Sequence, residues 1–256
     1  MPPLPTAPRE KRLLGASLKM YLDLPSTNKY ISSIASLNSA AEAADLDFFV
    51  IPDFVTLLPS AEKLASTSIL LGAQDCHSED KGAYTGEVSP VVLAQAGVKI
   101  VEIGHAERRA LFGETDETVA AKAVAIVRNG MTPLICIGEK PRSSIASQAV
   151  GLAISECKPQ ITAALSSIPE TADVILAYEP VWAIGASEPA GADHVVAVTQ
   201  SLRELVKGRQ GRVRILYGGS AGPGTFEALK EGIDGLFLGR FAHDIKNLEK
   251  VIEEIK

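Results

Sequence analysis

The sequence predicts an α/β protein built as a single (β/α)8 barrel, and three observations support this prediction. The chain has 256 residues, a usual length for one such barrel. Short apolar runs rich in β-branched residues alternate with longer amphipathic stretches through eight cycles. No linker rich in proline, glycine or serine divides the chain into halves, which disfavours two open-sheet domains. We therefore expect residues 1–256 to form one domain with an extended N-terminal tail at 1–12.

The eight apolar runs are the expected strands, and each is followed by a stretch with helical spacing. In the first of these stretches, apolar residues recur at helical spacing between Tyr30 and Leu37. Ser26 or Thr27 provides a candidate N-cap, so a helix is expected over 27–44. The expected strands cover 13–19, 47–52, 69–75, 100–103, 132–137, 174–178, 213–217 and 235–238.

Composition and charge restrict the class of protein. Hydrophobic residues make up 46% of the chain and charged residues 22%, which is the mix of a folded globular protein and excludes a disordered one. The net charge is -6 and no local basic patch stands out. We therefore expect no nucleic-acid partner and no binding to an anionic membrane surface.

Cysteine usage and the N-terminal sequence indicate a cytosolic protein. Cys76, Cys136 and Cys157 are widely spaced and form no CxxC motif, so neither a disulfide framework nor a zinc site is expected. Residues 1–12 lack the apolar segment of a secretory signal, and no apolar run is long enough to span a membrane. We expect a reducing, cytosolic location and no membrane partner.

Polar side chains directly after the strands are the candidates for chemistry, because barrel active sites lie at the carboxyl ends of the strands. Lys19 ends the first run, where an ammonium group is costly to desolvate unless it faces a polar mouth. It is a candidate anion ligand, although a lysine that extends its ammonium group into solvent fits the spacing equally well. A lone histidine is more often structural than catalytic, but His105 follows the fourth run and is itself followed by Glu107 and two arginines, which keeps it as a catalytic candidate.

The sixth run is followed by Glu179 and then by an apolar loop. A carboxylate in this position is expected to have a raised pKa, which suits a general base near neutral pH. The loop has the composition of a lid anchored by the single tryptophan of the chain, although an aromatic residue packed on the barrel rim explains it nearly as well. The lid residues are Pro180, Val181, Trp182, Ala183 and Ile184.

Glycine-rich turns follow the last two runs. Backbone N–H groups at such turns commonly bind a phosphate in barrels. The segment 218–222 also matches the G-x-S-x-G motif, and Asp234 and His243 follow in the order of a hydrolase triad. Too little chain follows Ser220 for the hydrolase fold, so we disfavour that interpretation. The chain has no P-loop, dinucleotide-binding or zinc-protease motif, and no cofactor or metal is expected.

The motifs at three strand ends resemble those of the triosephosphate isomerase family. Residues 177–185 read AYEPVWAIG, residues 217–220 read YGGS, and residues 104–109 read GHAERR where the family has GHSERR. The resemblance extends from Leu14 to about Ile255 and implies the TIM barrel fold. It also implies an isomerase without a cofactor and, for a triose phosphate substrate, a place in glycolysis and gluconeogenesis.

The resemblance also implies a role for each candidate, as that role is known for the family. Glu179 would move a proton between adjacent carbons, His105 would polarise the carbonyl as a neutral imidazole, and Lys19 would offset the negative charge of the substrate. Glu107 would support these groups. The loop 76–90 is similar to the projecting dimer loop of the family and implies a homodimer. The substrate phosphate would be held by Gly185, Ser220, Gly239 and Arg240.

The sequence departs from the family at the wall of this site. Ser17 stands where the family has asparagine, so a side-chain amide becomes a shorter hydroxyl and space opens beside Lys19. Ala106 replaces the serine after the histidine, and Arg240 replaces a glycine with a long cation. Residues 186–187 differ from the usual hinge of the lid. The reacting groups are retained while their surroundings differ.

These observations predict an isomerase of a short sugar phosphate, either aldose–ketose or ketose–ketose. By the extent of the resemblance, the expected reaction interconverts glyceraldehyde 3-phosphate and dihydroxyacetone phosphate through an enediolate. The alternative is a paralogue acting on a four-carbon ketose phosphate such as erythrulose phosphate, because the space at Ser17 would accept another hydroxymethyl group and Arg240 could bind a displaced phosphate. A weakly active sugar-phosphate-binding relative is a third alternative, and the retention of all three reacting groups argues against it.

Overall fold

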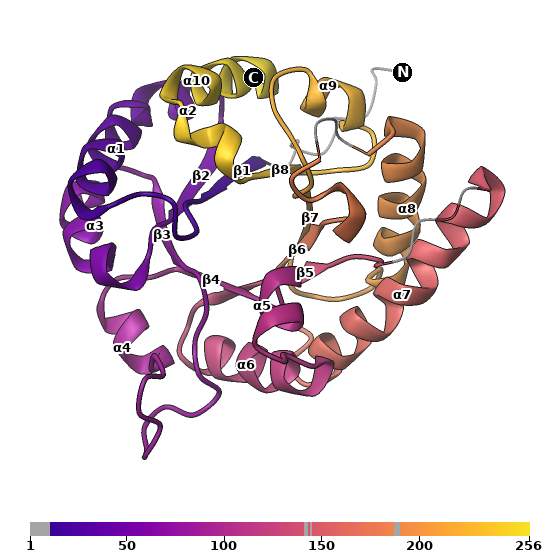
Figure 1. Ribbon diagram of the computed structural model, residues 1–256, viewed down its shortest axis with the longest axis horizontal. Coiled ribbons are helices and arrows are strands. Elements are labelled where there is room, and N and C mark those ends of the chain that lie inside the picture. Colours follow the sequence, from indigo (N-terminus) through magenta and orange to yellow (C-terminus); the bar gives the residue numbers. More distant parts are fainter. Residues whose placement is uncertain (1–10, 141–142, 144, 187–189) are drawn as a thin grey trace, which may run out of the picture.

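The computed structural model describes residues 11–140, 143, 145–186 and 190–256, which form a closed parallel barrel surrounded by helices (Figure 1). Within the described residues the strands follow one another around the barrel in chain order, and β8 pairs with β1 to close it. The predicted (β/α)8 fold is thus confirmed. The strands are β1 (Arg12–Ser17), β2 (Leu46–Ile51), β3 (Leu70–Ala73), β4 (Ile100–Ile103), β5 (Thr132–Ile137), β6 (Val174–Tyr178), β7 (Val213–Tyr217) and β8 (Gly235–Leu238).

Helices cover the outside of the barrel, and short 3-10 helices lie in the loops (Figure 1). The 3-10 helices within the described residues are η1 (Phe54–Thr56), η2 (Val181–Ala183) and η3 (Arg240–His243). The α-helices there are α1 (Leu24–Ser36), α2 (Asn38–Ala43), α3 (Leu57–Leu64), α4 (Pro90–Gln95), α5 (Ala106–Leu111), α6 (Asp116–Arg128), α7 (Ala146–Ser166), α8 (Ala192–Leu205), α9 (Thr225–Leu229) and α10 (Ile245–Ile255).

Two apolar cores hold the barrel together, because successive strand residues point alternately inward and outward. The inner core fills the barrel, where the rings of Phe49 and Phe237 stack with their centroids 5.8 Å apart. The outer core lies between the strands and the helices and contains Phe48, the direct neighbour of Phe49. Since both faces of the sheet are buried, most residues of each strand are apolar.

Closure of the barrel requires a glycine at position 235. Gly235 pairs with Leu13 where β8 meets β1. A Cβ atom on residue 235 would overlap the carbonyl oxygen of Leu13, so no other residue fits without moving the two strands apart. This close approach keeps the strand ends, and the side chains that follow them, at a common rim.

The structure corrects the first predicted helix. In place of one helix over 27–44, α1 begins at Leu24 and a separate helix, α2, ends at Ala43. The N-cap is Asp23 and not Ser26 or Thr27: the Asp23 carboxylate accepts the Ser26 N–H at 2.8 Å. An aspartate cap followed by a proline in the first turn is a stronger start signal than the two hydroxyl residues.

The predicted limits of three strands and of the tail also need correction. The first, second and third strands were expected to end at 19, 52 and 75, and they end at Ser17, Ile51 and Ala73. The first cannot continue to Lys19, because that residue has a φ of 49°, outside the β region. Arg12 belongs to β1 and not to the tail, while 1–10 lie outside the described residues.

The chain between β3 and α4 projects from the barrel as a loop (Figure 1). Its base is closed by the His77 N–H, which donates to the Val88 carbonyl at 2.8 Å. Within the loop the His77 ring lies 4.1 Å from the Tyr84 ring, measured between centroids. This loop is the predicted dimer loop, and it has its own internal contacts in the single chain.

Two sequence predictions about location can be compared with the structure. Cys76, Cys136 and Cys157 are buried and unpaired. None of the helices in the described part of the chain combines the length and the apolar character needed to cross a bilayer. The cytosolic location itself stays a prediction.

Candidate active site

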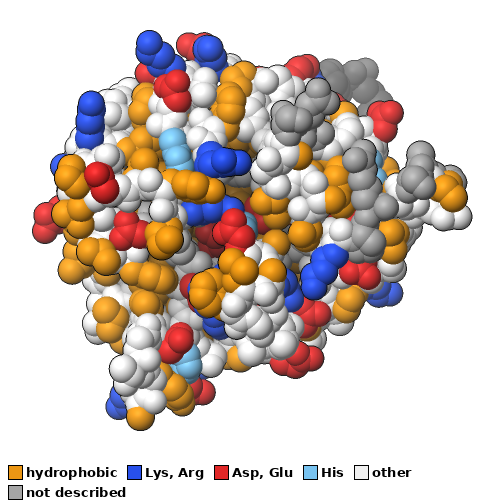
Figure 2. Space-filling model, in the orientation of Figure 1, with side chains coloured by type: hydrophobic (Ala, Val, Ile, Leu, Met, Phe, Trp, Pro, Cys, Tyr) orange, Lys and Arg blue, Asp and Glu red, His pale blue; other side chains and the backbone are white. Residues whose placement is uncertain are grey.

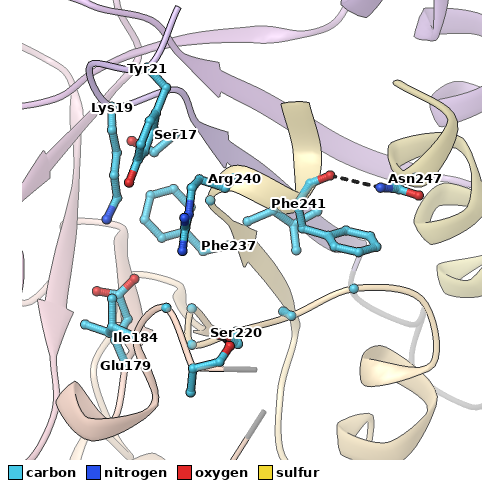
Figure 3. Close-up of a pocket in the computed structure, with 18 of the residues that line it drawn as sticks. Ser17, Lys19, Tyr21, Glu179, Ile184, Ser220, Phe237, Arg240, Phe241 and Asn247 are labelled. Carbon is cyan, nitrogen blue, oxygen red and sulfur yellow. Dashed lines mark hydrogen bonds between the residues drawn. The ribbon is translucent and has the colours of Figure 1, made fainter. Parts of the chain in front are cut away.

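A cavity of about 800 Å³ opens at the carboxyl ends of the strands (Figure 3), and acidic and basic side chains gather at the barrel mouth in Figure 2. Of the predicted lid, only Ile184 lines this cavity; Pro180, Val181, Trp182 and Ala183 do not. The other predicted site residues come together there from the ends of five strands, β1, β4, β6, β7 and β8. They are Ser17, Lys19, His105, Glu107, Glu179, Gly185, Ser220, Gly239 and Arg240.

Lys19 and Glu107 form an ion pair on one side of the cavity. The Lys19 Nζ lies 2.7 Å from Glu107 Oε1, and the lysine side chain is 22% exposed. Burial alone would lower the pKa of Lys19, but the hydrogen bond and the charge of Glu107 raise it overall. For Glu107 the directions are reversed: burial alone would raise its pKa, but the hydrogen bond from Lys19 and the charge of Lys19 lower it overall. Lys19 therefore carries a stable positive charge at the cavity wall.

His105 is a neutral imidazole with a defined orientation. It is the N-cap of α5, where its Nδ1 accepts the backbone N–H of Glu107 at 3.1 Å. This bond assigns the proton to Nε2, which lies 3.4 Å from Glu179 Oε2. Burial, followed by the charge of Lys19, lowers the pKa of His105 to about 4. The side chain can therefore donate a hydrogen bond from Nε2 without being charged.

Glu179 is the most buried carboxyl group that lines the cavity. It follows β6 and is 5% exposed, and its Oε2 has no hydrogen-bond partner among the described residues. Burial and the negative charge of Glu102 raise the pKa of Glu179 to about 8. A side chain on Gly218 would overlap the Glu179 carboxyl group, so the glycine makes room for it. A carboxylate with one oxygen free of hydrogen bonds and with this pKa is suited to accept a proton from a bound substrate.

The predicted lid is held on its inner side by Glu139, a residue that follows β5. The Trp182 Nε1 donates to Glu139 Oε1 at 2.9 Å, and the Tyr178 hydroxyl donates to Glu139 Oε2 at 3.1 Å. Glu139 is 1% exposed. The tryptophan therefore has a polar contact as well as the apolar packing expected from the sequence.

The lid is held on its outer side by the end of β7. The Ser220 hydroxyl lies 2.7 Å from the Ala186 carbonyl oxygen and 3.1 Å from that of Ala183. The Ala190 N–H donates to the Tyr217 hydroxyl oxygen at 2.9 Å. These contacts place the segment that contains Gly185 over the cavity. Ser187, one of the two changed hinge positions, lies outside the described residues.

The end of the cavity opposite Lys19 contains the predicted phosphate ligands. Gly185 has a φ of 71°, which favours glycine, and it turns the lid backbone toward the cavity. Arg240 extends across the same space from the end of β8, with its guanidinium 5.8 Å from the centre of the Tyr21 ring (Figure 3). Within the described residues no salt bridge pairs Arg240 with a carboxylate, so its charge is available to an anion.

The alternative hydrolase triad does not assemble. The Ser220 hydroxyl points to the lid backbone. Asp234 lies before β8, at the opposite end of the barrel, where it pairs with Arg203 at 2.9 Å. His243 packs against the Tyr21 ring at a centroid distance of 5.5 Å. The described residues also contain no cluster of His, Cys, Asp and Glu that could hold a metal ion.

Two carboxylates near the cavity, Glu139 and Glu102, were not among the residues predicted from the sequence. Glu139 stands after the fifth run, in Ile137-Gly138-Glu139, and the same strand-end rule that identified Glu179 would have found it. Glu102 lies inside an apolar run, where a carboxylate is unexpected. Its carboxyl group accepts the Ser17 hydroxyl at 3.0 Å, and burial raises its pKa to about 7.

Comparison with known proteins identifies the relatives of this chain. The triosephosphate isomerase family profile matches residues 12–255. The L-erythrulose-1-phosphate isomerase of Pectobacterium atrosepticum is 44% identical over 252 residues, which cover 95% of each chain. That of Rhizobium meliloti is 40% identical over 249 residues, 94% of this chain and 96% of the relative. The triosephosphate isomerase of Aquifex aeolicus is 36% identical over 249 residues, 94% of this chain and 98% of the relative.

Proposed function

Because this chain belongs to the triosephosphate isomerase family, we propose that it isomerises a four-carbon ketose phosphate by moving a proton between two adjacent carbons. One observation carries the reaction: the unpartnered Oε2 of Glu179 lies 3.4 Å from the Nε2 of a neutral His105, inside a cavity that also contains Lys19. The four-carbon substrate is supported by the names of the relatives that are 40% and 44% identical.

Each reacting group has one task in the proposed mechanism. Glu179 removes the proton from the carbon beside the carbonyl, and the electron pair of that C–H bond forms an enediolate with the carbonyl carbon. The His105 Nε2–H and the Lys19 ammonium group stabilise the oxygen that gains charge. Glu179 then returns the proton to the former carbonyl carbon. His105 gives its Nε2 proton to the former carbonyl oxygen, which becomes a hydroxyl, and takes the proton of the neighbouring hydroxyl, whose oxygen becomes the new carbonyl. The phosphate ester is not broken and no electron acceptor is needed.

A ketotetrose phosphate meets the requirements of this mechanism. Conversion of erythrulose 1-phosphate into erythrulose 4-phosphate moves the carbonyl by one carbon, as in a triose phosphate, and the substrate is one hydroxymethyl group larger. Ser17, shorter than the asparagine of the family, lines the cavity and supplies the space. Arg240 supplies a cation for the phosphate at the other end. A tetrulose phosphate substrate would serve a different route from glycolysis and gluconeogenesis.

A triose phosphate is the second candidate, and it was the substrate expected from the sequence. It is supported by the 36% identical triosephosphate isomerase and by the retention of Lys19, His105 and Glu179. Both candidates use the same proton transfer, so the difference lies in how the cavity holds the end of the sugar that is distant from the phosphate.

A direct comparison of turnover tests the proposal. The purified protein is assayed with erythrulose 1-phosphate and with glyceraldehyde 3-phosphate under the same conditions. We expect kcat/KM to be at least about tenfold higher for the tetrulose phosphate, the usual effect of one well-accommodated group. A preference for the triose phosphate would support the second candidate. No turnover of either sugar would overturn the enzymatic proposal.

We also propose that the protein forms a homodimer through the projecting loop. Apolar side chains gather on the side of the molecule that carries α3 and this loop (Figure 2). Val55 is 77% exposed, Leu58 is 63% exposed and Tyr84, in the loop, is 46% exposed. Large apolar side chains grouped on one surface are typical of a protein interface. A second copy of this chain is the partner that the family resemblance implies.

A further inference from the structure

A carboxyl group lies beneath the cavity and has no part in the proton transfer described above. Glu102 is on β4, on the same inward face as Ile100, which belongs to the inner core. It is 4% exposed and does not line the cavity. Its polar contacts are the Ser17 hydroxyl, which donates at 3.0 Å, and the Cys136 thiol at 3.9 Å. Within the described residues no salt bridge involves Glu102.

Packing does not explain a carboxyl group at this position. On the same inward face Asp47 and Arg214 pair with each other at 2.6 Å, whereas Glu102 has no ion-pair partner among the described residues. A valine or leucine would fill its space without the cost of burying a group that ionises. The cost is visible in the pKa of Glu102, which burial raises to about 7. The side chain therefore needs a role that an apolar residue could not perform.

Ser17 connects this carboxyl group to the cavity. The serine lies at the end of β1, lines the cavity and is 2% exposed. A hydroxyl has one hydrogen, and Ser17 gives it to Glu102, so the oxygen can only accept further hydrogen bonds. The Ser17–Glu102 pair, which we call the carboxyl floor, thus presents a fixed acceptor to the cavity.

The position of the carboxyl floor matches the extra group of a tetrulose phosphate. In erythrulose 1-phosphate the terminal hydroxymethyl is bonded to the carbon that loses its proton, on the side away from the phosphate. Figure 3 shows Ser17 beside Lys19 and across the cavity from Ser220, where the phosphate is proposed to lie. With the reacting carbons at Glu179 and the phosphate at Ser220, the terminal hydroxyl would extend toward Ser17.

We propose that Glu102 is a positioning residue for substrate specificity: it orients the Ser17 hydroxyl so that its oxygen accepts a hydrogen bond from the terminal hydroxymethyl group of a ketotetrose phosphate. The inference rests on the proposed function. Under this inference, two features favour a tetrulose phosphate over a triose phosphate: the space beside Ser17 and a polar contact with the Ser17 oxygen. A triose phosphate has no terminal hydroxymethyl group and leaves this oxygen without a partner.

Substitutions of Glu102 test the inference with both sugars as substrates. Glu102→Val removes the acceptor for the serine proton. We expect kcat/KM for erythrulose 1-phosphate to fall about tenfold more than that for glyceraldehyde 3-phosphate, mainly through KM. Glu102→Gln keeps an oxygen that accepts the serine proton, and the ratio of the two kcat/KM values should return to within about threefold of wild type. If Glu102→Val does not fold, Glu102→Met provides the same loss at the original side-chain length.

Two further variants separate specificity from general damage. Selectivity is the ratio of kcat/KM for erythrulose 1-phosphate to kcat/KM for glyceraldehyde 3-phosphate. The double variant Ser17→Ala with Glu102→Val should lower this ratio no more than Ser17→Ala alone, because Glu102 acts through Ser17. Ile100→Val, on the same face of β4, is the matched control and should alter both substrates equally. Equal losses for both sugars in Glu102→Val, or additive losses in the double variant, would overturn the inference while leaving the proposed function intact. A wild-type enzyme inactive on erythrulose 1-phosphate would overturn both.

Discussion

Burial sets the protonation of the two reacting groups in opposite directions. It raises the pKa of the Glu179 carboxyl group to about 8 and lowers that of the His105 imidazole to about 4. Both shifts have the same cause, since a low-dielectric cavity disfavours whichever form of a group is charged. The carboxylate becomes a stronger base and the imidazole remains a neutral donor. This is the combination that an enediolate mechanism needs.

Replacing the base should abolish most of the activity. In Glu179→Gln we expect kcat to fall at least about a hundredfold with little change in KM, because the amide cannot accept the substrate proton but still fills the site. Steady-state kinetics with the preferred sugar phosphate measure this. Glu249→Gln, an exposed position on α10, is the control and should match wild type. A Glu179→Gln enzyme with most of its activity would remove Glu179 from the role of base.

The dependence of activity on pH follows from the same carboxyl group. Glu179 must be ionised to act, and its pKa is raised to about 8, so kcat/KM should increase from about pH 6 to about pH 9. Because the negative charge of Glu102 contributes to the raised pKa, Glu102→Gln should move the midpoint of the profile to lower pH. A profile that falls over this range, or a midpoint unchanged in the variant, would contradict the assignment.

At the scale of secondary structure, the lid depends on hydrogen bonds from the ends of β5 and β7, the two strands on either side of β6. Glu139 after β5 holds Trp182, and Tyr217 at the end of β7 holds Ala190. The two anchors lie on either side of Gly185, so they set how far the lid backbone reaches over the cavity. Strand positions thus control a loop that has little regular structure of its own.

Removing the hydrogen bond between Tyr217 and Ala190 should make the lid close less completely over the cavity. Tyr217→Phe loses the acceptor for the Ala190 N–H, and one such bond corresponds to about a fivefold loss in kcat/KM. Water would enter more often, so the amount of inorganic phosphate released per turnover should rise. Phosphate release and turnover are measured in the same assay. Tyr84→Phe, in the projecting loop, is the control, and an equal effect there would show that the lid is not responsible.

At the scale of the whole molecule, an exposed apolar face indicates association. A charge at the centre of a dimer interface is costly to desolvate, so Val55→Asp should convert the proposed dimer into a monomer. Sedimentation velocity measures the change in mass. Leu205→Asp, on the outside of α8 and 40% exposed, should leave the mass unchanged. A wild-type protein that sediments as a monomer would contradict the proposal directly.

Regular elements were predictable where the local pattern is strong. The limits of β4 to β8 agree with the predicted apolar runs. A strand that is buried on both faces consists mostly of apolar residues, so the run and the strand begin and end together. The ends of β1 and β3 were placed too late, since Leu18 and Asp75 continue an apolar or extended pattern while the backbone has already left the sheet. A strand ends where its backbone angles leave the β region and its hydrogen bonds to the neighbouring strand stop. Both depend on the position of the neighbouring strand, which the local sequence does not record.

The sequence by itself determined the barrel and placed the candidate groups Lys19, His105 and Glu179 at strand ends, where the structure brings them to one cavity. These follow from periodicity and from residue types at strand ends, which are local properties of the chain. Only the tertiary structure decided the environment of these groups: the neutral state of His105, the unpartnered oxygen of Glu179 and the contact between Ser17 and Glu102. The physical reason is that burial and hydrogen bonding join residues from different strands, here 85 positions apart, and no local pattern records which of them meet.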